Sequence, residues 1–419
     1  MLHFERTLFS IQVLGFAALA LCTSSQTVWG SQPDLPSPED ILNQSRQGLR
    51  FSKACAQGQK MTIAAVGDVL LHDDPQIQAV RDPARFTSLW ARIQDLLARA
   101  DVTYANLEGT VAWGIDRDKH KVRDPGFVFD DIVYSGLPRL NYHRYLLDDL
   151  VASGFDIVST ANNHAMDRGT LGLERTIDAL RAAGLPFAGT RKASEGNREW
   201  FTITETRGIR LAWISCTRRI NPDKAYPKDQ ILNCHNDTVE IEKLIRRIVR
   251  RGMADAVIIT PHWGGQYMHV PKPKQIEISR RFLEAGALVV MGAHPHTIQP
   301  WEKVITRDGR ETFVFYSLGN FVSGHRELPK RATVILNVGL TKRPNGEILV
   351  NGVNYIPVLM RRERSAEGWY LTAEALERHP QGESSNQVHD ARILLESILG
   401  DRNRASPDSP LTTNPECSK

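Results

Sequence analysis

The chain has 419 residues, of which 41% are hydrophobic and 24% are charged, with 30 Gly and 22 Pro. This composition is typical of a globular protein and excludes a disordered, collagenous or coiled-coil chain. The net charge of +4 is too small an excess for a nucleic-acid-binding protein, in which clustered basic residues are expected. A weakly basic surface is compatible with an anionic substrate but does not require one.

The N-terminal segment predicts an export signal. Two basic residues precede an apolar run over 8–21, which is too short for a comfortable membrane-spanning helix, and small and polar residues follow it. We therefore expect residues 1–30 to be a signal peptide and the rest of the chain to lie outside the cytoplasm. A retained N-terminal anchor and a lipid attached at Cys22 remain as alternatives.

The cysteine content agrees with export. Without Cys22 the chain keeps four cysteines, an even number that can pair in an oxidising compartment. We predict a Cys216–Cys234 disulfide, which closes a polar segment. Four free thiols, or other pairings that involve Cys55 and Cys417, remain as alternatives.

Composition along the chain divides it into four parts. Residues 1–30 are the signal or anchor, and residues 31–60, rich in Pro, Ser and Gln, predict a linker. Residues 61–362 form one large domain. Residues 363–419 are expected to hold a C-terminal helix and a polar tail, disordered from about residue 400.

The large domain has the pattern of an α/β fold. A helical stretch, a glycine and a short Val/Ile-rich strand recur in that order, with the glycines at Gly154, Gly184, Gly252 and Gly286. Alternating helices and strands predict a sheet of parallel strands. Two stretches, 201–214 and 333–353, predict hairpins instead. We therefore expect mixed sheets with antiparallel additions.

Residues of the types that bind metal ions lie where the predicted strands end. Sites in α/β sheets form just beyond the carboxyl ends of the strands. Five of the 13 histidines lie at or just past such ends, together with Asp68, Glu108 and several Asn. Carboxylate and imidazole ligands suit Mn, Fe or Zn, and a set without cysteine is not a closed structural zinc site. Each residue alone could be a cap, turn or surface residue, so the prediction depends on their number.

Six motifs in this order resemble the CapA family of bacterial capsule (poly-gamma-glutamate) synthesis proteins, which is related to the calcineurin-like metallophosphoesterases. The motifs are Gly67-Asp68, Asn106-Leu107-Glu108, Asn162-Asn163-His164, His262-Trp263-Gly264, Gly292-Ala293-His294-Pro295-His296 and Ser317-Leu318-Gly319-Asn320-Phe321. The resemblance covers roughly residues 60–325. It implies a four-layer α/β/β/α sandwich with mixed sheets and a two-metal site at one edge.

The resemblance also implies roles for individual residues. The implied metal ligands are Asp68, Glu108, Asn163, His262, His294 and His296, with Glu108 in the place of a bridging Asp. His164 is the implied catalytic acid, which protonates the leaving group. Residues that would support the site or touch substrate are His72, Asn106, Asn162 and Asn320. The chain departs from the wider superfamily in two places, because His72 follows Asp68 by four positions rather than two, and Glu108 replaces an Asp.

We therefore expect an extracytoplasmic hydrolase of capsule biosynthesis that uses two divalent ions, Mn, Fe or Zn, to cleave a phosphoester or an anionic polymer linkage. The alternative is a non-catalytic accessory subunit of a membrane-bound complex that synthesises and exports a capsule polymer. No nucleic-acid partner is expected. The segment 109–148 mixes basic and aromatic residues, and it would be either a lid for an anionic polymer or a solvated surface loop.

Overall fold

The computed structural model describes residues 35–196, 199–221, 226–366, 368–378, 385–414 and 417. The expected signal peptide lies outside these residues. From Pro36 onward the described chain forms one compact unit. Among the helices of the described ranges, none combines the length and the apolar character needed to cross a bilayer.

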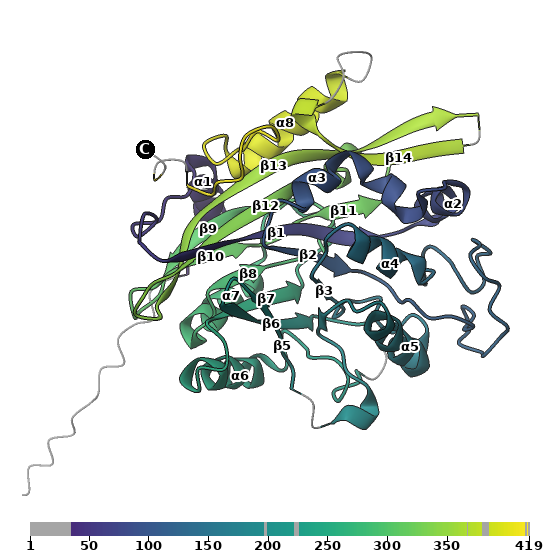
Figure 1. Cartoon of the computed structure of the whole chain (residues 1–419), viewed down its shortest axis with the longest axis horizontal. Helices are drawn as coiled ribbons and strands as arrows, with labels where there is room; N and C mark the ends of the chain where they lie inside the picture. The colour runs from purple at the N-terminus through teal and green to yellow at the C-terminus, as the bar shows by residue number, and fades with distance from the viewer. Residues whose placement is uncertain are drawn as a thin grey trace, which may run out of the picture. The chain divides into compact units, whose positions relative to one another are not determined.

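Two mixed sheets form the centre of this unit (Figure 1). The first has the order β14 (Gly368–Ala375), β13 (Ile348–Ser365), β12 (Ala332–Lys342), β1 (Gln59–Leu70), β2 (Val102–Leu107), β3 (Ile157–Ser159), β4 (Phe187–Ala188), and β11 (Asn320–Ser323) pairs with the end of β1. The second has the order β5 (Thr202–Thr206), β6 (Ile209–Thr217), β7 (Ala256–His262), β8 (Val289–Met291), β10 (Glu311–Phe315), β9 (Trp301–Ile305). Parallel strands β1 to β4 and β6, β7, β8 and β10 are flanked by antiparallel ones, as the sequence predicts.

The two sheets pack face to face, and helices cover their outer faces. Between the sheets, the ring of Tyr104 on β2 stacks on Trp213 of β6, with centroids 5.5 Å apart. The helices on the first sheet are α2 (Asp73–Arg81), α4 (Tyr145–Ala152) and α5 (Gly169–Ala182), and those on the second are α6 (Thr238–Arg250) and α7 (Pro273–Ala285). The smaller α3 is Gln94–Leu97, and α1 (Pro38–Gln47) packs on α8 (Ser385–Leu399). The expected four-layer α/β/β/α class is confirmed.

Both predicted hairpins are confirmed. The first joins β5 to β6 through Arg207 and Gly208, whose φ angles of 50° and 65° are those of a tight hairpin turn. The second joins β12 to β13 around Gly346, which also has a positive φ. Turn residues between two runs rich in β-branched residues were therefore a sufficient signal.

The predicted linker over 31–60 needs correction. It contains α1, which begins at Pro38 and is capped by Ser37, whose side chain accepts a hydrogen bond from the main-chain N–H of Asp40. Proline at the first turn of a helix replaces an N–H that would have no partner, so a Pro-rich stretch can begin a helix. The first strand of the sheet also begins before the end of this segment, at Gln59.

The predicted boundary at residue 362 and the disordered tail need correction as well. The first sheet continues past 362, because β13 ends at Ser365 and β14 pairs with it. In the described part of the tail, Tyr355 of β13 donates to the carbonyl of Asn403 (3.0 Å), and Ala405 donates back to Tyr355 (2.8 Å). The polar composition of the tail did not predict this pairing, because main-chain groups rather than apolar side chains make the contacts.

Two disulfides lie within this unit. The predicted Cys216–Cys234 bond is present, with Cα atoms 5.1 Å apart. A second bond joins Cys55 to Cys417, which are 362 positions apart in the sequence.

Aromatic residues of the segment 109–148 pack on the domain, whereas its basic residues Lys119, Lys121 and Arg123 are exposed. Tyr134 and Tyr142 are buried, and Phe127 packs on the core beneath the first sheet. The hydroxyl of Tyr142 donates to the main-chain carbonyl of Glu108 (2.6 Å), and Arg117 forms an ion pair with Asp131 (2.8 Å). The aromatic side chains therefore hold the segment against the domain, and the ion pair connects two parts of the segment itself.

Candidate metal centre

Strands from both sheets bring the predicted ligands to one edge of the sandwich. Asp68 lies in β1, His262 ends β7, and the others lie in the loops that follow β2, β3 and β8. Because parallel strands end at the same edge of a sheet, residues far apart in the sequence meet there. All six predicted ligands are buried, namely Asp68, Glu108, Asn163, His262, His294 and His296.

Two unusual backbone features shape this edge. A Cβ atom at Gly67 would lie 2.0 Å from the carbonyl oxygen of Gly319, to which the N–H of Asp68 donates (3.0 Å), so only glycine fits before Asp68. His294 and His296 both have positive φ angles, 97° and 59°. This strained conformation turns both rings toward the centre.

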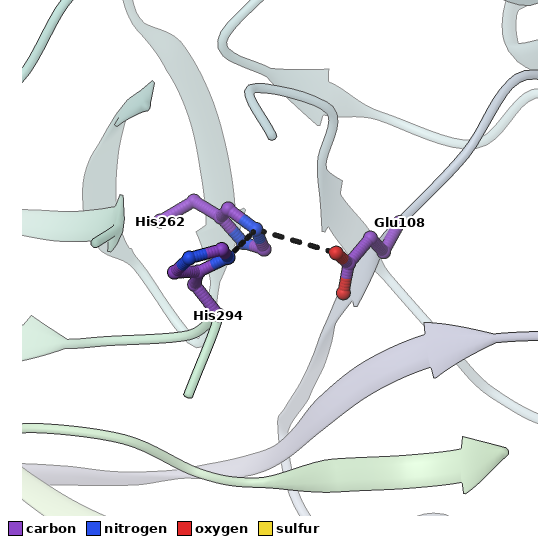
Figure 2. Close-up of side chains that lie close together, drawn as sticks. All are labelled: Glu108, His262 and His294. Atoms are coloured by element: carbon purple, nitrogen blue, oxygen red, sulfur yellow. Dashed lines mark hydrogen bonds and ion pairs between the residues drawn. The ribbon is translucent and has the colours of Figure 1, made fainter. Parts of the chain in front are cut away.

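One group of ligand atoms surrounds Nε2 of His262 (Figure 2). It lies 3.4 Å from Oε1 of Glu108 and 3.1 Å from Nδ1 of His294. Oδ1 of Asn163 is 2.7 Å away. We call these four residues the His262 cluster.

A second group surrounds Nδ1 of His296. Oδ2 of Asp68 lies 3.1 Å from this nitrogen, and Oε2 of Glu108 lies 3.8 Å from it. Oδ1 of Asn320, which the sequence suggested only as a supporting residue, is 3.0 Å away. We call these residues the His296 cluster, and Glu108 contributes one carboxylate oxygen to each cluster.

Both clusters have the spacing and chemistry of sites for divalent cations. Two atoms that each lie about 2.0–2.2 Å from one cation are at most about 4.4 Å apart. The distances from Nε2 of His262 and from Nδ1 of His296 to the other candidate ligand atoms meet that limit. Both oxygens of Glu108 and Nδ2 of Asn163 are buried and have no hydrogen-bond partner within the described residues. A buried carboxylate without a partner is costly, and a cation would supply one. The residues fit two divalent ions, and their role as ligands stays a prediction.

Charge interactions at the centre are strong. Burial and the charge of Glu108 raise the pKa of Asp68. Burial alone would raise the pKa of Glu108 too, but the charges of His296 and His262 lower it overall. Burial opposes protonation of His296, yet the two carboxylates raise its pKa to about 9. In this arrangement the two acids hold positive charge between them, which is the environment that a cation needs.

His164 lies beside the clusters and is a member of neither. Its Nδ1 is 2.7 Å from Oδ2 of Asp167, an oxygen that also accepts a hydrogen bond from the N–H of Leu140 (2.6 Å). Burial lowers the pKa of His164, but the charge and hydrogen bond of Asp167 outweigh burial and raise it. Sequence reasoning missed Asp167, although its position three residues after His164 within one turn was a usable signal.

Comparison with known proteins identifies the family. Residues 62–325 match the family model described as bacterial capsule synthesis protein PGA_cap. The chain belongs to this family. Its curated relatives include the capsule biosynthesis protein CapA of Bacillus anthracis, 24% identical over 270 residues, which are 64% of this chain and 60% of that protein. The PGA biosynthesis protein CapA of Bacillus subtilis (strain 168) is 22% identical over 294 residues, 70% of this chain and 71% of that protein.

Two further comparisons are more distant. A probable polyglutamine synthesis accessory protein of Mycobacterium tuberculosis is 26% identical over 160 residues, 35% of this chain and 40% of that protein. Among solved structures, the sulfate thiohydrolase SoxB of Thermus thermophilus superposes with a TM-score of 0.38 at 13% identity, over 81% of this chain and 60% of that one.

In this member of the PGA_cap family, the predicted supporting asparagines brace the centre. Nδ2 of Asn106 donates to Oδ1 of Asp68 (2.8 Å) and lies 3.2 Å from Nδ1 of His262. Asn162 donates to the carbonyl of Leu107 (2.7 Å) and accepts from the N–H of His164 (3.1 Å). Both therefore fix the orientation of residues that face the centre.

His72 lies outside both clusters. Its Nδ1 accepts a hydrogen bond from the N–H of Gly324 (2.9 Å), and its ring meets the ring of His325 edge-on at 4.7 Å. Burial and the charge of His296 lower the pKa of His72 to about 4. His325, which sequence reasoning missed, lies 5.6 Å from the ring of His296, and only the folded chain shows that it borders the centre.

Proposed function

We propose that this capsule synthesis family member is an extracytoplasmic, metal-dependent hydrolase whose substrate is a phosphoester or a linkage in an anionic polymer such as poly-gamma-glutamate. The proposal depends mainly on Glu108, whose Oε1 lies near His262 and whose Oε2 lies near His296. A carboxylate shared in this way suits two neighbouring cations, the arrangement that hydrolytic two-metal sites use. The two disulfides support a location outside the cytoplasm.

The two clusters would hold the cations, and their mixed oxygen and nitrogen ligands favour Mn, Fe or Zn. When bound, such a pair of ions polarises the scissile bond and activates water. His164 supplies the proton for the leaving group, because Asp167 holds its ring in place and favours its protonated form. Burial of the centre keeps bulk water out, which strengthens each of these electrostatic interactions.

A second candidate function is that of a non-catalytic accessory in a membrane-bound polymer synthesis and export complex. It is favoured by the printed name of the mycobacterial relative, a probable polyglutamine synthesis accessory protein. In that role the metal centre would stabilise the fold or a contact with a partner, and turnover would be absent.

Metal analysis combined with a substrate panel separates the two functions. The full chain, loaded with Mn, is assayed on an aryl phosphodiester, an aryl phosphomonoester and poly-gamma-glutamate. The hydrolase predicts turnover that requires added metal, is lost in Asp68→Ala and is kept in Asp390→Ala, a matched control at an exposed position of α8. Metal-loaded wild type without turnover, together with full rescue of a capsule-deficient strain by the Asp68→Ala protein, would establish the accessory role instead.

A further inference from the structure

The segment between Cys216 and Cys234, which we call the disulfide loop, reaches the metal centre. Its described residues are 217–221 and 226–233. The main-chain N–H of Asn221 donates to the carbonyl of Asn163 (2.7 Å), and Nδ2 of Asn221 lies 3.4 Å from Nε2 of His164. The loop therefore touches a predicted ligand and the predicted acid at the same time.

Arg219 of this loop has no acceptor for its buried donor. Its Nε is buried and lacks a hydrogen-bond partner within the described part of the chain. The hydroxyl of Thr217 donates to the carbonyl of Arg219 (2.9 Å), which fixes the main chain at this position. By contrast, the neighbouring Arg218 donates through Nη1 to the carbonyl of Gly264 (3.0 Å). Leaving a guanidinium donor buried and unpaired is unfavourable, so the position is suited to an acceptor that the chain itself does not provide.

The main chain two positions after Arg219 contacts the His262 cluster, because the N–H of Asn221 donates to the carbonyl of Asn163 (2.7 Å). Two bound divalent ions would carry more positive charge than the negative charge of Asp68 and Glu108, so the centre would be positive overall. Arg219 would add to this positive charge.

We propose that Arg219 is a substrate-binding residue that pairs with an anionic oxygen, of a phosphate or a carboxylate, held beside the His262 cluster. The planar guanidinium can donate two parallel hydrogen bonds to either group, which lysine cannot do. This inference rests on the proposed function. It adds that the substrate carries a negative charge next to the scissile bond. Phosphate would come from a phosphoester, and carboxylate from a polymer of glutamate.

Anion binding by the Mn-loaded full chain tests this inference without depending on turnover. Inorganic phosphate and glutarate are titrated calorimetrically into wild type, Arg219→Gln, Arg219→Lys and the control Arg251→Gln, whose side chain is exposed beyond α6. We expect Arg219→Gln to weaken binding of one anion about 10–100-fold. Arg219→Lys should recover part of that loss, and Arg251→Gln should bind as wild type does. A loss confined to phosphate supports a phosphoester, and a loss confined to glutarate supports a carboxylate polymer.

Three results would overturn the inference: wild-type affinity in Arg219→Gln, a wild type that binds neither anion, or reduced metal content in both Arg219 variants. A wild type that binds an anion through Arg219 but turns over no substrate would refute the hydrolase while leaving the anion site in place. The two failures are therefore distinguishable. Thermal unfolding of each variant establishes that the loop change has not unfolded the domain.

Discussion

Oδ2 of Asp167 lies 2.7 Å from Nδ1 of His164, and this pair stands beside the two clusters rather than within them. Because His164, the proposed catalytic acid, is not one of the predicted ligands, its role can be tested without removing a ligand. We predict that His164→Ala lowers turnover about 100–10,000-fold and leaves metal content unchanged. Esters with leaving groups of low pKa should suffer least, because they need little protonation.

Steady-state rates on a series of aryl esters, with elemental analysis of the same preparations, measure both quantities. His389→Ala is the matched control, since His389 is exposed on α8. Asp167→Asn should reduce turnover by a smaller factor than His164→Ala. Loss of metal from His164→Ala would mean that the ring is a ligand and that its assignment as the acid is wrong.

Metal stoichiometry tests the sharing of Glu108 between the clusters. Glu108→Ala removes a ligand oxygen from both clusters, so we predict that both sites lose their ions. Removing His294 affects only the His262 cluster, and removing Asp68 affects only the His296 cluster. Each of these single variants should keep about one ion per chain after dialysis, measured by inductively coupled plasma mass spectrometry. Equal stoichiometry in all three variants would contradict the shared carboxylate.

The Cys216–Cys234 bond is predicted to stabilise the domain and to hold the loop at the centre. The closed segment of 17 intervening residues gives a chain-entropy stabilisation of about 3 kcal/mol. The double variant Cys216→Ser/Cys234→Ser should therefore unfold at lower urea concentration and lose turnover, because Asn221 and Arg219 are no longer held in place. The variant Cys55→Ser/Cys417→Ser serves as comparison, since it should lose stability and keep turnover in its folded fraction. Full turnover in the first variant would separate the loop from catalysis.

His143 predicts a dependence of stability on pH. Burial lowers its pKa to about 4, although the charge of Asp124 opposes this, and rings of Phe127, Tyr134 and Tyr145 surround it. An unfolded histidine titrates near pH 6.5, so between these values the unfolded state binds more protons. The contribution of His143 to stability is therefore complete above about pH 6.5 and falls as the pH drops toward 4, by about 2 kcal/mol at pH 5.

Urea unfolding at pH 7.5 and at pH 5 measures this difference. His143→Asn should remove the part of the pH dependence that comes from the ring, whereas His389→Asn should leave it unchanged. An unaltered pH profile in His143→Asn would show that other groups cause the acid sensitivity.

The sequence predicted the edge where the site lies, because strand ends are recognisable and parallel strands must bring their ends together. Asp68, Glu108 and His262 could be found in this way. The oxygen of Asn320 and the carboxylate of Asp167 could not be assigned, since their positions depend on contacts with His296 and Leu140 that only the folded chain creates. The edge strand β14 was missed for a similar reason. Its own sequence does not indicate a strand, and its pairing with β13 stabilises it.

The Cys55–Cys417 bond turns most of the chain into one covalent ring. Because the two cysteines are 362 positions apart in the sequence, the ring cannot close until both sheets and all their connections have been synthesised and exposed to an oxidant. The Cys55–Cys417 bond would therefore be present only in molecules in which the whole ring has been synthesised. A single backbone cut inside the ring would leave one molecule of unchanged mass on a non-reducing gel, and two fragments only after reduction. A protease could therefore nick this protein without separating the two halves of the candidate metal centre.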